Sequence, residues 1–206
     1  MMYRTAQLKI KDKDLYLCGK DETKICNCCG TQSCSFRQAA KRLTAVDPNF
    51  LYVIVSGLHG DSPNENGDYF EWDKNHFDWE KEVFGYEGEL LNKRNGSYVY
   101  ETWKGKPNLI NHDEKVVVGH IEDVFHIPEE KGIDKLLAVN RQTQPLLVGD
   151  IEKEIITEVS MGCLVASSIC SKCKHIAHDE NEWCGHMKFH KGRKDEDGDL
   201  IYEINK

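Results

Sequence analysis

Four residues near the C-terminus have the types and the spacing of a zinc site: Cys170, Cys173, Cys184 and His186. They form the pattern C-S-K-C-x10-C-G-H, in which two close pairs of ligands are separated by a short excursion. Tetrahedral zinc takes four sulfur or nitrogen ligands, and two such pairs supply them with little loop strain. Because the protein would fill all four positions, we expect a structural zinc ion rather than a catalytic one. The competing interpretation is two reduced, buried thiols beside unrelated surface residues.

A second group of cysteines lies near the N-terminus, in the pattern C-x7-C-x-C-C-x4-C: Cys18, Cys26, Cys28, Cys29 and Cys34. Close-spaced cysteines in a reducing cytoplasm more often bind metal or carry out redox chemistry than form disulfides. Four of these five thiols could bind a second zinc ion, an iron–sulfur cluster is a lesser alternative, and free thiols in a surface loop are a third. The spacing does not decide which four would bind.

A serine and a histidine between these two groups have the types needed for nucleophilic catalysis. A serine nucleophile needs a base within hydrogen-bond reach and backbone N–H groups that stabilise the oxyanion. Ser160 lies in Val-Ser-Met-Gly, where Gly162 would let the backbone pass close to a bound carbonyl. His112, in the segment KPNLINHD ahead of a β-like run, is the best candidate base. Each residue alone is more often structural, so the pair needs further support.

The elements expected to position these residues are strands with interspersed helices, without regular βαβ repetition, and this pattern predicts an α+β fold. A continuous apolar run predicts a buried strand over 50–57, and Asp-Pro ends a helix predicted over 36–46. Gly, Asn, Asp and Pro predict a loop over 58–68, and the segment EGELLNKRNGS is rich in turn residues. The other predicted strands cover 6–10, 116–125, 135–140 and 155–165, and the other predicted helices cover 73–84 and 145–153.

Composition limits the classes of function. With 27 basic and 35 acidic residues and a net charge of -8, the chain is poorly suited to binding phosphate backbones, so no nucleic-acid partner is expected.

No apolar run approaches a membrane span and the N-terminus lacks a signal-peptide h-region, so we expect a soluble cytoplasmic protein without a membrane partner. The charged end KGRKDEDGDLIYEINK is expected to be a loose tail with a short strand, and the basic group before and within it a solvated face: Lys188, Lys191, Arg193 and Lys194.

Four segments, in this order, resemble the prohead maturation proteases of tailed bacteriophages, which are serine proteases related to the herpesvirus assemblins. NENGDYF (64–70) is similar to the N-x-N-G-D-x-F segment of that family. YETWKGKP (100–107) with NHD (111–113) is similar to the stretch that leads to the catalytic histidine, and GHIEDV (119–124) to the strand after it. VSMGC (159–163), followed by Cys-x-x-Cys and Cys-x-His, looks like the catalytic serine segment of a subgroup with a zinc knuckle.

The resemblance implies a herpesvirus-protease-like fold, in which helices flank a β-barrel-like core and a zinc knuckle follows the nucleophile strand. His112 and Ser160 would lie on neighbouring strands and face one cleft, with Ser160 as nucleophile and His112 as base. The prohead protease domain would cover 50–206, including the knuckle at 170–186 and the charged C-terminal tail. Residues 1–49, a cysteine-rich segment with a helix, lie outside the resemblance.

The third catalytic residue stays open. Assemblins use a second histidine after the serine, and this chain offers four in that region: His175, His178, His186 and His190. His186 is better assigned to zinc. The acidic alternatives are Asp68, Asp113 and Asp123, of which Asp113 ranks low because neighbours on a strand point to opposite faces.

The resemblance also implies the substrates and the place of action. These are the phage scaffold protein and the major capsid precursor, cleaved inside the assembling prohead in the cytoplasm of a bacterial host, with self-association as a plausible switch. The first alternative is an inactive zinc-binding protein of capsid assembly or scaffolding. A zinc-ribbon module that binds nucleic acid and a redox protein built on the N-terminal cysteines are two others.

Overall fold

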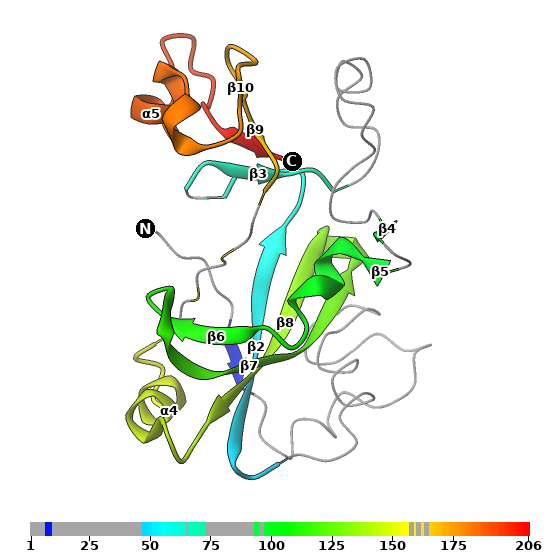
Figure 1. The fold of residues 1–206 in the computed structure, drawn as a ribbon, viewed down its shortest axis with the longest axis vertical. Coiled ribbons are helices and arrows are strands. Elements are labelled where there is room, and N and C mark those ends of the chain that lie inside the picture. Colours follow the sequence, from blue (N-terminus) through cyan, green and yellow to red (C-terminus); the bar gives the residue numbers. More distant parts are fainter. Residues whose placement is uncertain are drawn as a thin grey trace. The chain divides into compact units, whose positions relative to one another are not determined.

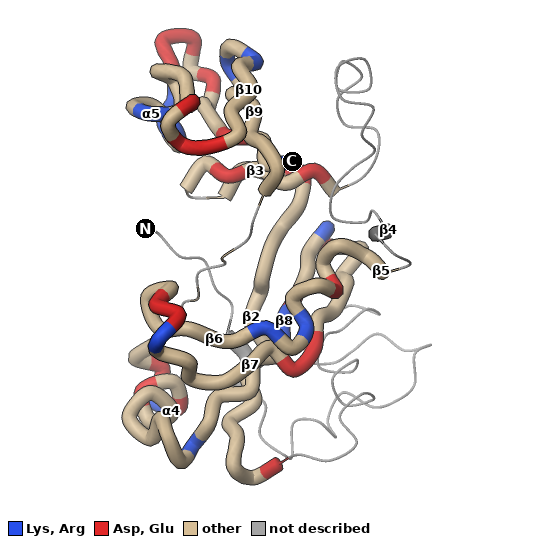
Figure 2. The backbone as a smooth tube through the Cα atoms, in the orientation of Figure 1, with Lys and Arg blue, Asp and Glu red and all other residues tan. Residues whose placement is uncertain are grey.

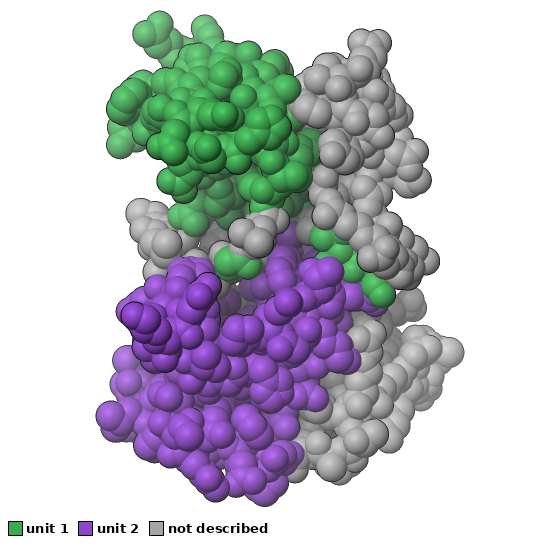
Figure 3. Space-filling model, in the orientation of Figure 1, with its two compact units in different colours: residues 1–3, 59–100, 162–206 green, residues 4–58, 101–161 purple. Residues whose placement is uncertain are grey.

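A computed structural model describes residues 7–9, 47–64, 66–72, 93–94, 97–156, 159, 162 and 165–206. Within these residues the fold is α+β and consists mostly of strands, with a five-stranded sheet, a four-stranded sheet, a two-stranded ribbon and a few short helices (Figure 1). The chain divides into two compact units, coloured in Figure 3. Unit 1 comprises residues 1–3, 59–100 and 162–206, and unit 2 comprises residues 4–58 and 101–161. The helices predicted over 36–46 and 73–84 lie outside the described residues.

The five-stranded sheet of unit 2 has the order β1-β2-β8-β7-β6. Its strands are β1 (Gln7–Lys9), β2 (Phe50–His59), β8 (Gly132–Asn140), β7 (Asp113–Ile127) and β6 (Pro107–Ile110). The strands predicted over 6–10, 50–57, 116–125 and 135–140 are confirmed, although most extend further than predicted, and β2 continues two residues into the predicted loop. In contrast, β6 was not predicted.

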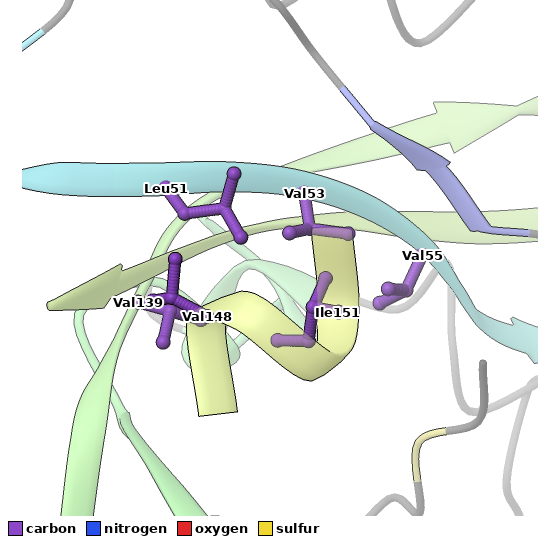
Figure 4. Close-up of a cluster of buried hydrophobic side chains, with 6 residues drawn as sticks. All are labelled: Leu51, Val53, Val55, Val139, Val148 and Ile151. Carbon is purple, nitrogen blue, oxygen red and sulfur yellow. The ribbon is translucent and has the colours of Figure 1, made fainter. Parts of the chain in front are cut away.

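One apolar cluster of unit 2 lies between β2, β8 and helix α4 (Pro145–Glu152). Leu51, Val53 and Val55 are alternate residues of β2, so their side chains point to the same face of the sheet and all belong to this cluster. Val148 and Ile151, three positions apart on α4, face the sheet (Figure 4). Burying each such side chain contributes about 1.5–3 kcal/mol. The helix predicted over 145–153 is therefore confirmed, and it begins at Pro145, where the fixed φ of proline suits a first helical position. The cluster consists of Leu51, Val53, Val55, Val139, Val148 and Ile151.

A tight hairpin joins β6 to β7. Ile110 pairs with Asp113, so the loop contains two residues, Asn111 and His112, with φ of 52° and 59°. Positive φ at both central positions is the pattern of a type I′ turn, whose twist matches that of the flanking strands. Further along β7, Gly119 permits close approach to β8, because a Cβ there would lie 1.8 Å from the carbonyl oxygen of Ala138.

Unit 1 contains a four-stranded sheet of order β10-β9-β11-β3. The strands are β10 (Ile176–Ala177), β9 (Ser168–Cys170), β11 (Glu203–Asn205) and β3 (Asp68–Phe70). Strand β11 runs parallel to β3 and antiparallel to β9. Its Ile204 is fully buried with Tyr69 and Ile169. The short strand expected in this C-terminal segment is present as β11, but the expectation of a loose tail is wrong, because the apolar residues at its end pack into the centre of a sheet.

Charged residues also hold unit 1 together, and acidic and basic residues both lie around β10 and α5 (Gly185–His190) (Figure 2). The side chains of Lys206 and Glu71 are almost completely buried, and Nζ lies 2.5 Å from Oε2. Lys191 forms ion pairs with Glu203 and with Asp68, the latter at 2.6 Å. The expectation that Lys191 belongs to a solvated face is therefore wrong, since its ammonium group is mostly buried between two carboxylates. The other three members of that basic group are exposed.

The segment between α4 and β9 differs from its prediction. The described residues within 155–165 are Ile155, Ile156, Val159, Gly162 and Val165, and none of them belongs to a strand. The backbone N–H groups of Ile155 and Ile156 both donate to the carbonyl of Asp150, at 2.9 and 3.4 Å, so the start of this stretch belongs to the end of the helix. The predicted strand is therefore wrong in these residues, and β9 begins only at Ser168.

The remaining short elements are the ribbon of β4 (Lys93–Arg94) and β5 (Ser97–Tyr98) and three 3-10 helices. The ribbon begins within the segment EGELLNKRNGS, which is rich in turn residues. The 3-10 helices cover Val99–Trp103, Pro128–Glu130 and Glu180–Glu182. Among the described residues, no helix has the length and apolar character needed to cross a membrane.

Candidate metal centre

The four residues predicted as zinc ligands lie together in unit 1. Their ligand atoms are all within 4.8 Å of one another: Cys170, Cys173, Cys184 and His186. Cys170 ends β9, Cys173 lies in the turn between β9 and β10, Cys184 immediately precedes α5, and His186 lies in its first turn. The structure therefore brings together a Cys3His cluster that can hold a metal ion.

Two of the distances within the cluster are close to those around a tetrahedral metal ion. The sulfur atoms of Cys173 and Cys184 are 3.5 Å apart, and the sulfur of Cys184 is 3.9 Å from Nδ1 of His186. Bond lengths of zinc to sulfur and to nitrogen place two tetrahedral sulfurs about 3.8 Å apart and a sulfur and a nitrogen about 3.6 Å apart. Both distances agree within a few tenths of an ångström, so the sulfur of Cys184 already lies near a tetrahedral spacing from Cys173 and His186.

The first pair of ligands is held by a tight turn at the end of β9. The N–H of Cys170 donates to the carbonyl of His175 at 2.9 Å, and the N–H of Lys174 donates back to Cys170 at 3.0 Å. Lys174 has φ 59°, which closes the turn. Burial raises the pKa of Cys170 to about 11, although the backbone N–H groups of Cys173 and Lys172 oppose this. A metal ion would overcome that shift, because a bound thiol is deprotonated.

The second pair of ligands is held by α5. Cys184 is the residue that precedes the helix, and its backbone is extended. Burial raises the pKa of Cys184, but the backbone N–H groups of Met187 and His186 and the neighbouring thiols of Cys173 and Cys170 lower it, and the net shift is downward. Met187 is buried beneath the helix. The helix therefore fixes the direction of His186 and places N–H groups next to the sulfur of Cys184.

The C-terminal segment supports the turn between Cys170 and Cys173. The N–H of Ser171 donates to the carbonyl of Tyr202 at 3.0 Å, and the N–H of Tyr202 donates to Oγ of Ser171 at 2.9 Å. Lys172 forms ion pairs with Asp195 and with Asp197, the latter at 3.0 Å. The two carboxylates raise the pKa of Lys172, and Lys172 lowers that of Asp195. Both residues between the two ligands are therefore attached to the segment that follows α5.

The excursion between the two ligand pairs is tied back to the sheet. Nε2 of His175 lies 2.7 Å from the carbonyl oxygen of Glu182. Nε1–H of Trp183 donates to Oγ of Ser168 at 3.3 Å, and Nζ of Lys191 lies 5.0 Å from the centre of the Trp183 ring. These contacts keep the ends of the excursion, and hence the two ligand pairs, close to each other.

The structure describes only one of the two predicted catalytic residues, His112. His112 occupies the exposed turn between β6 and β7, so the expectation that it lies on a strand is wrong. Ser160 lies outside the described residues, and the assignment of these two residues as base and nucleophile stays a prediction. The second cysteine group, at 18–34, also lies outside the described residues.

The candidates for a third catalytic residue have other contacts. Asp113 accepts a hydrogen bond from the N–H of Lys115 at 2.9 Å, and the buried Asp123 forms an ion pair with Lys104 at 3.2 Å. Asp68 pairs with Lys191. Nδ1 of His178 lies 3.3 Å from the carbonyl oxygen of Ala166, and His190 is exposed on α5. None of these contacts selects a third residue.

Sequence reasoning missed the support that Lys172 and Asp195 give to the metal centre. Lys172 stands between two predicted ligands, and Asp195 lies in a segment rich in acidic residues. A lysine next to a cysteine pair and an acidic run downstream are a signal of opposite charge, but the sequence does not show that a turn brings them together.

Comparisons of the chain with models of protein families, with curated proteins and with solved structures found no match.

Proposed function

We propose that this protein is a serine endopeptidase that resembles the prohead maturation proteases of tailed bacteriophages. The observation that carries the proposal is the order of the four similar segments, 64–70, 100–113, 119–124 and 159–163, with a metal-ligand pattern directly after the last. The α+β organisation, with its predominance of strands, is compatible with the herpesvirus-protease-like fold that the proposal includes.

In this proposal Ser160 Oγ attacks the scissile carbonyl carbon while His112 takes the hydroxyl proton. The tetrahedral intermediate collapses when His112 passes this proton to the leaving amine, and water then hydrolyses the acyl-enzyme. Backbone N–H groups stabilise the oxyanion, and each such donor lowers the barrier by about 3–4 kcal/mol in other serine proteases.

The metal centre has a structural role in the proposal. Four protein ligands close the coordination shell of zinc, so no position remains for substrate or for a nucleophilic water. Cys170 follows Ser160 by ten residues, and fixing it limits the freedom of the chain that carries the serine. A catalytic group must be held within about 0.5 Å of its productive position, which such an anchor helps to achieve.

The substrates in this proposal are the phage scaffold protein and the major capsid precursor. Cleavage takes place inside the assembling head, in the cytoplasm of the bacterial host. Self-association during assembly is the proposed switch, because a protease that is active before assembly would degrade its substrates too early. Nucleic acid is not a proposed partner, since the chain carries a net charge of -8.

The second candidate function is that of an inactive zinc-binding protein of capsid assembly or scaffolding. The placement of His112 favours it: the residue has positive φ in an exposed turn, and its side chain makes no hydrogen bond within the described residues. A catalytic base is usually oriented by a hydrogen-bond partner, and none of the described residues supplies one.

Co-expression with the capsid precursor and the scaffold protein separates the two candidates. We would compare the intact masses of all chains for the wild type, Ser160→Ala and His112→Ala, and measure zinc in the same samples. The protease proposal predicts defined cleavage in the wild type and none in either variant, with zinc bound in all three. Identical masses in all three, with folded proteins and assembled heads, would establish the inactive candidate instead.

A further inference from the structure

The three thiols of the metal centre differ in their exposure. Cys170 is fully buried at the end of β9, Cys184 is half-buried and Cys173 is exposed. A small oxidant in solution therefore reaches the sulfur of Cys173 first. The difference follows from the fold, since β9 lies inside the sheet whereas Cys173 lies in the turn beyond it.

Two sulfurs lie close to the exposed thiol, those of Cys184 and Cys170. The sulfur atoms of Cys173 and Cys184 are 3.5 Å apart, so forming a bond of about 2.05 Å requires an approach of about 1.5 Å. Cys173 lies in a turn and Cys184 in an extended residue before a short helix, where such an approach changes few backbone contacts. By contrast, Cys170 is fixed on both sides, because its strand pairs with β10 and β11.

We infer that Cys173 and Cys184 form an oxidation site at which a peroxide produces a disulfide and releases the metal ion. The inference depends on the metal centre of the proposed function but not on its protease activity. The exposed Cys173 sulfur takes one oxygen from the peroxide and becomes a sulfenic acid. The sulfur of Cys184 then attacks it and expels that oxygen as water. With hydrogen peroxide, two thiolates, one peroxide and two protons give one disulfide and two water molecules.

Metal release follows from the loss of ligands. A disulfide sulfur is a poor ligand for zinc because the thiolate is the binding form. Only Cys170 and His186 remain, and two ligands do not hold the ion that four held. The disulfide in turn connects the ends of the excursion, residues 173 and 184, so these ends stay together after the metal ion leaves. Reduction and added zinc should restore the original centre.

The experiment uses the zinc-loaded full chain without substrate. Hydrogen peroxide is added in the absence of reductant, released zinc is measured with a chromogenic chelator, and disulfides are assigned by the masses of non-reduced peptides. Peptide assignment is needed because the chain contains nine cysteines. We expect one zinc ion released per Cys173–Cys184 disulfide, and recovery of bound zinc after reduction and addition of zinc. Zinc that stays bound while other cysteines are oxidised would overturn the inference, as would a disulfide between Cys170 and either thiol.

A conservative variant sharpens the test. Cys173→His keeps four ligands for zinc but removes one of the two sulfurs, so it should bind zinc and resist its release by peroxide. Equal release from this variant and from the wild type would contradict the inference. If the variant does not bind zinc, the peptide masses of the wild type decide alone. A wild type that binds no zinc when reduced would contradict the metal centre itself, which distinguishes that failure from a failure of the oxidation site.

Discussion

The two compact units are stabilised by different interactions. In unit 2, six buried apolar side chains pack between β2, β8 and α4: Leu51, Val53, Val55, Val139, Val148 and Ile151. Among the described residues of unit 1, one buried cluster at the four-stranded sheet has three members, Tyr69, Ile169 and Ile204, and this unit also contains buried ion pairs and the Cys3His cluster. Small apolar cores generally need a metal or a disulfide for stability. We therefore expect a metal ion bound at this cluster to contribute more to the stability of unit 1 than to that of unit 2.

The largest effect should follow from removal of a metal ligand. Cys173→Ser leaves three ligands, and because metal binding contributes directly to folding, zinc should be lost and unit 1 destabilised. Zinc content and thermal unfolding would measure this. Cys163→Ser, a cysteine outside the ligand set, is the matched control and should retain zinc. Full zinc occupancy in Cys173→Ser would show that the cluster is not the binding site.

A core substitution in unit 2 should destabilise unit 2 but leave zinc bound to unit 1. Ile151→Ala removes a side chain that α4 buries against the sheet, and such truncations cost about 2–5 kcal/mol in the free energy of unfolding. Denaturant unfolding followed together with zinc release would show whether unit 2 loses stability while unit 1 keeps its metal. If zinc is instead released at the same denaturant concentration at which unit 2 of the variant unfolds, the two units unfold as one.

A smaller effect is expected from the support around the metal centre. Lys172→Met removes the ion pairs with Asp195 and Asp197 that hold the turn between Cys170 and Cys173. Because these ion pairs are exposed and do not touch a ligand side chain, the metal affinity should fall only about 2–5-fold. Chelator competition would measure the affinity, with Lys194→Met as control, since Lys194 is exposed and makes no ion pair within the described residues. Equal affinities in the two variants would mean that the turn holds its shape without Lys172.

The smallest effect should be a loss of stability in alkaline solution. Burial lowers the pKa of Lys191, but its hydrogen bonds to Asp68 and Glu203 raise it by more, so the net shift is upward. Burial raises the pKa of Tyr69 as well. Both groups bind their protons more tightly in the folded chain than in the unfolded chain, where their pKa values are about 10.4 and 10. Their contribution is therefore fully present below about pH 10 and is lost as the pH rises through the folded values.

This alkaline loss can be measured as the unfolding midpoint of the zinc-loaded protein across that range. Lys191→Arg should lose less, because a guanidinium group stays charged where an ammonium group does not. A midpoint that falls equally in both proteins would assign the loss to other groups.

The parts of the fold that local sequence determines were predictable. Strand β2 follows from one continuous apolar run, α4 from a segment that begins at Pro145, and the metal ligands from two short spacings. Each of these signals lies within a few residues of the chain.

The parts that depend on distant pairing were not predictable. Strand β11 is three residues long, follows a charged segment and pairs with β3, more than 130 residues earlier in the chain. Lys172 pairs with a loop more than 20 residues away. His112 was expected on a strand because the family resemblance implied it, but the turn at Asn111 and His112 depends on pairing between β6 and β7. A short strand was expected in the C-terminal segment, but nothing local in the sequence identified its partner strand, the partner of Lys172 or the turn at His112.

The proposal of a serine protease is tested most directly by labelling the nucleophile. A fluorophosphonate reacts with an activated serine hydroxyl and requires no knowledge of the cleavage site. We would label the wild type, Ser160→Ala and His112→Ala, each co-expressed with capsid precursor and scaffold, and determine the labelled peptide and the zinc content of each protein. The account predicts one label on Ser160 in the wild type and none in either variant, with zinc bound throughout. A folded, zinc-loaded wild type that takes up no label in assembled heads would contradict it.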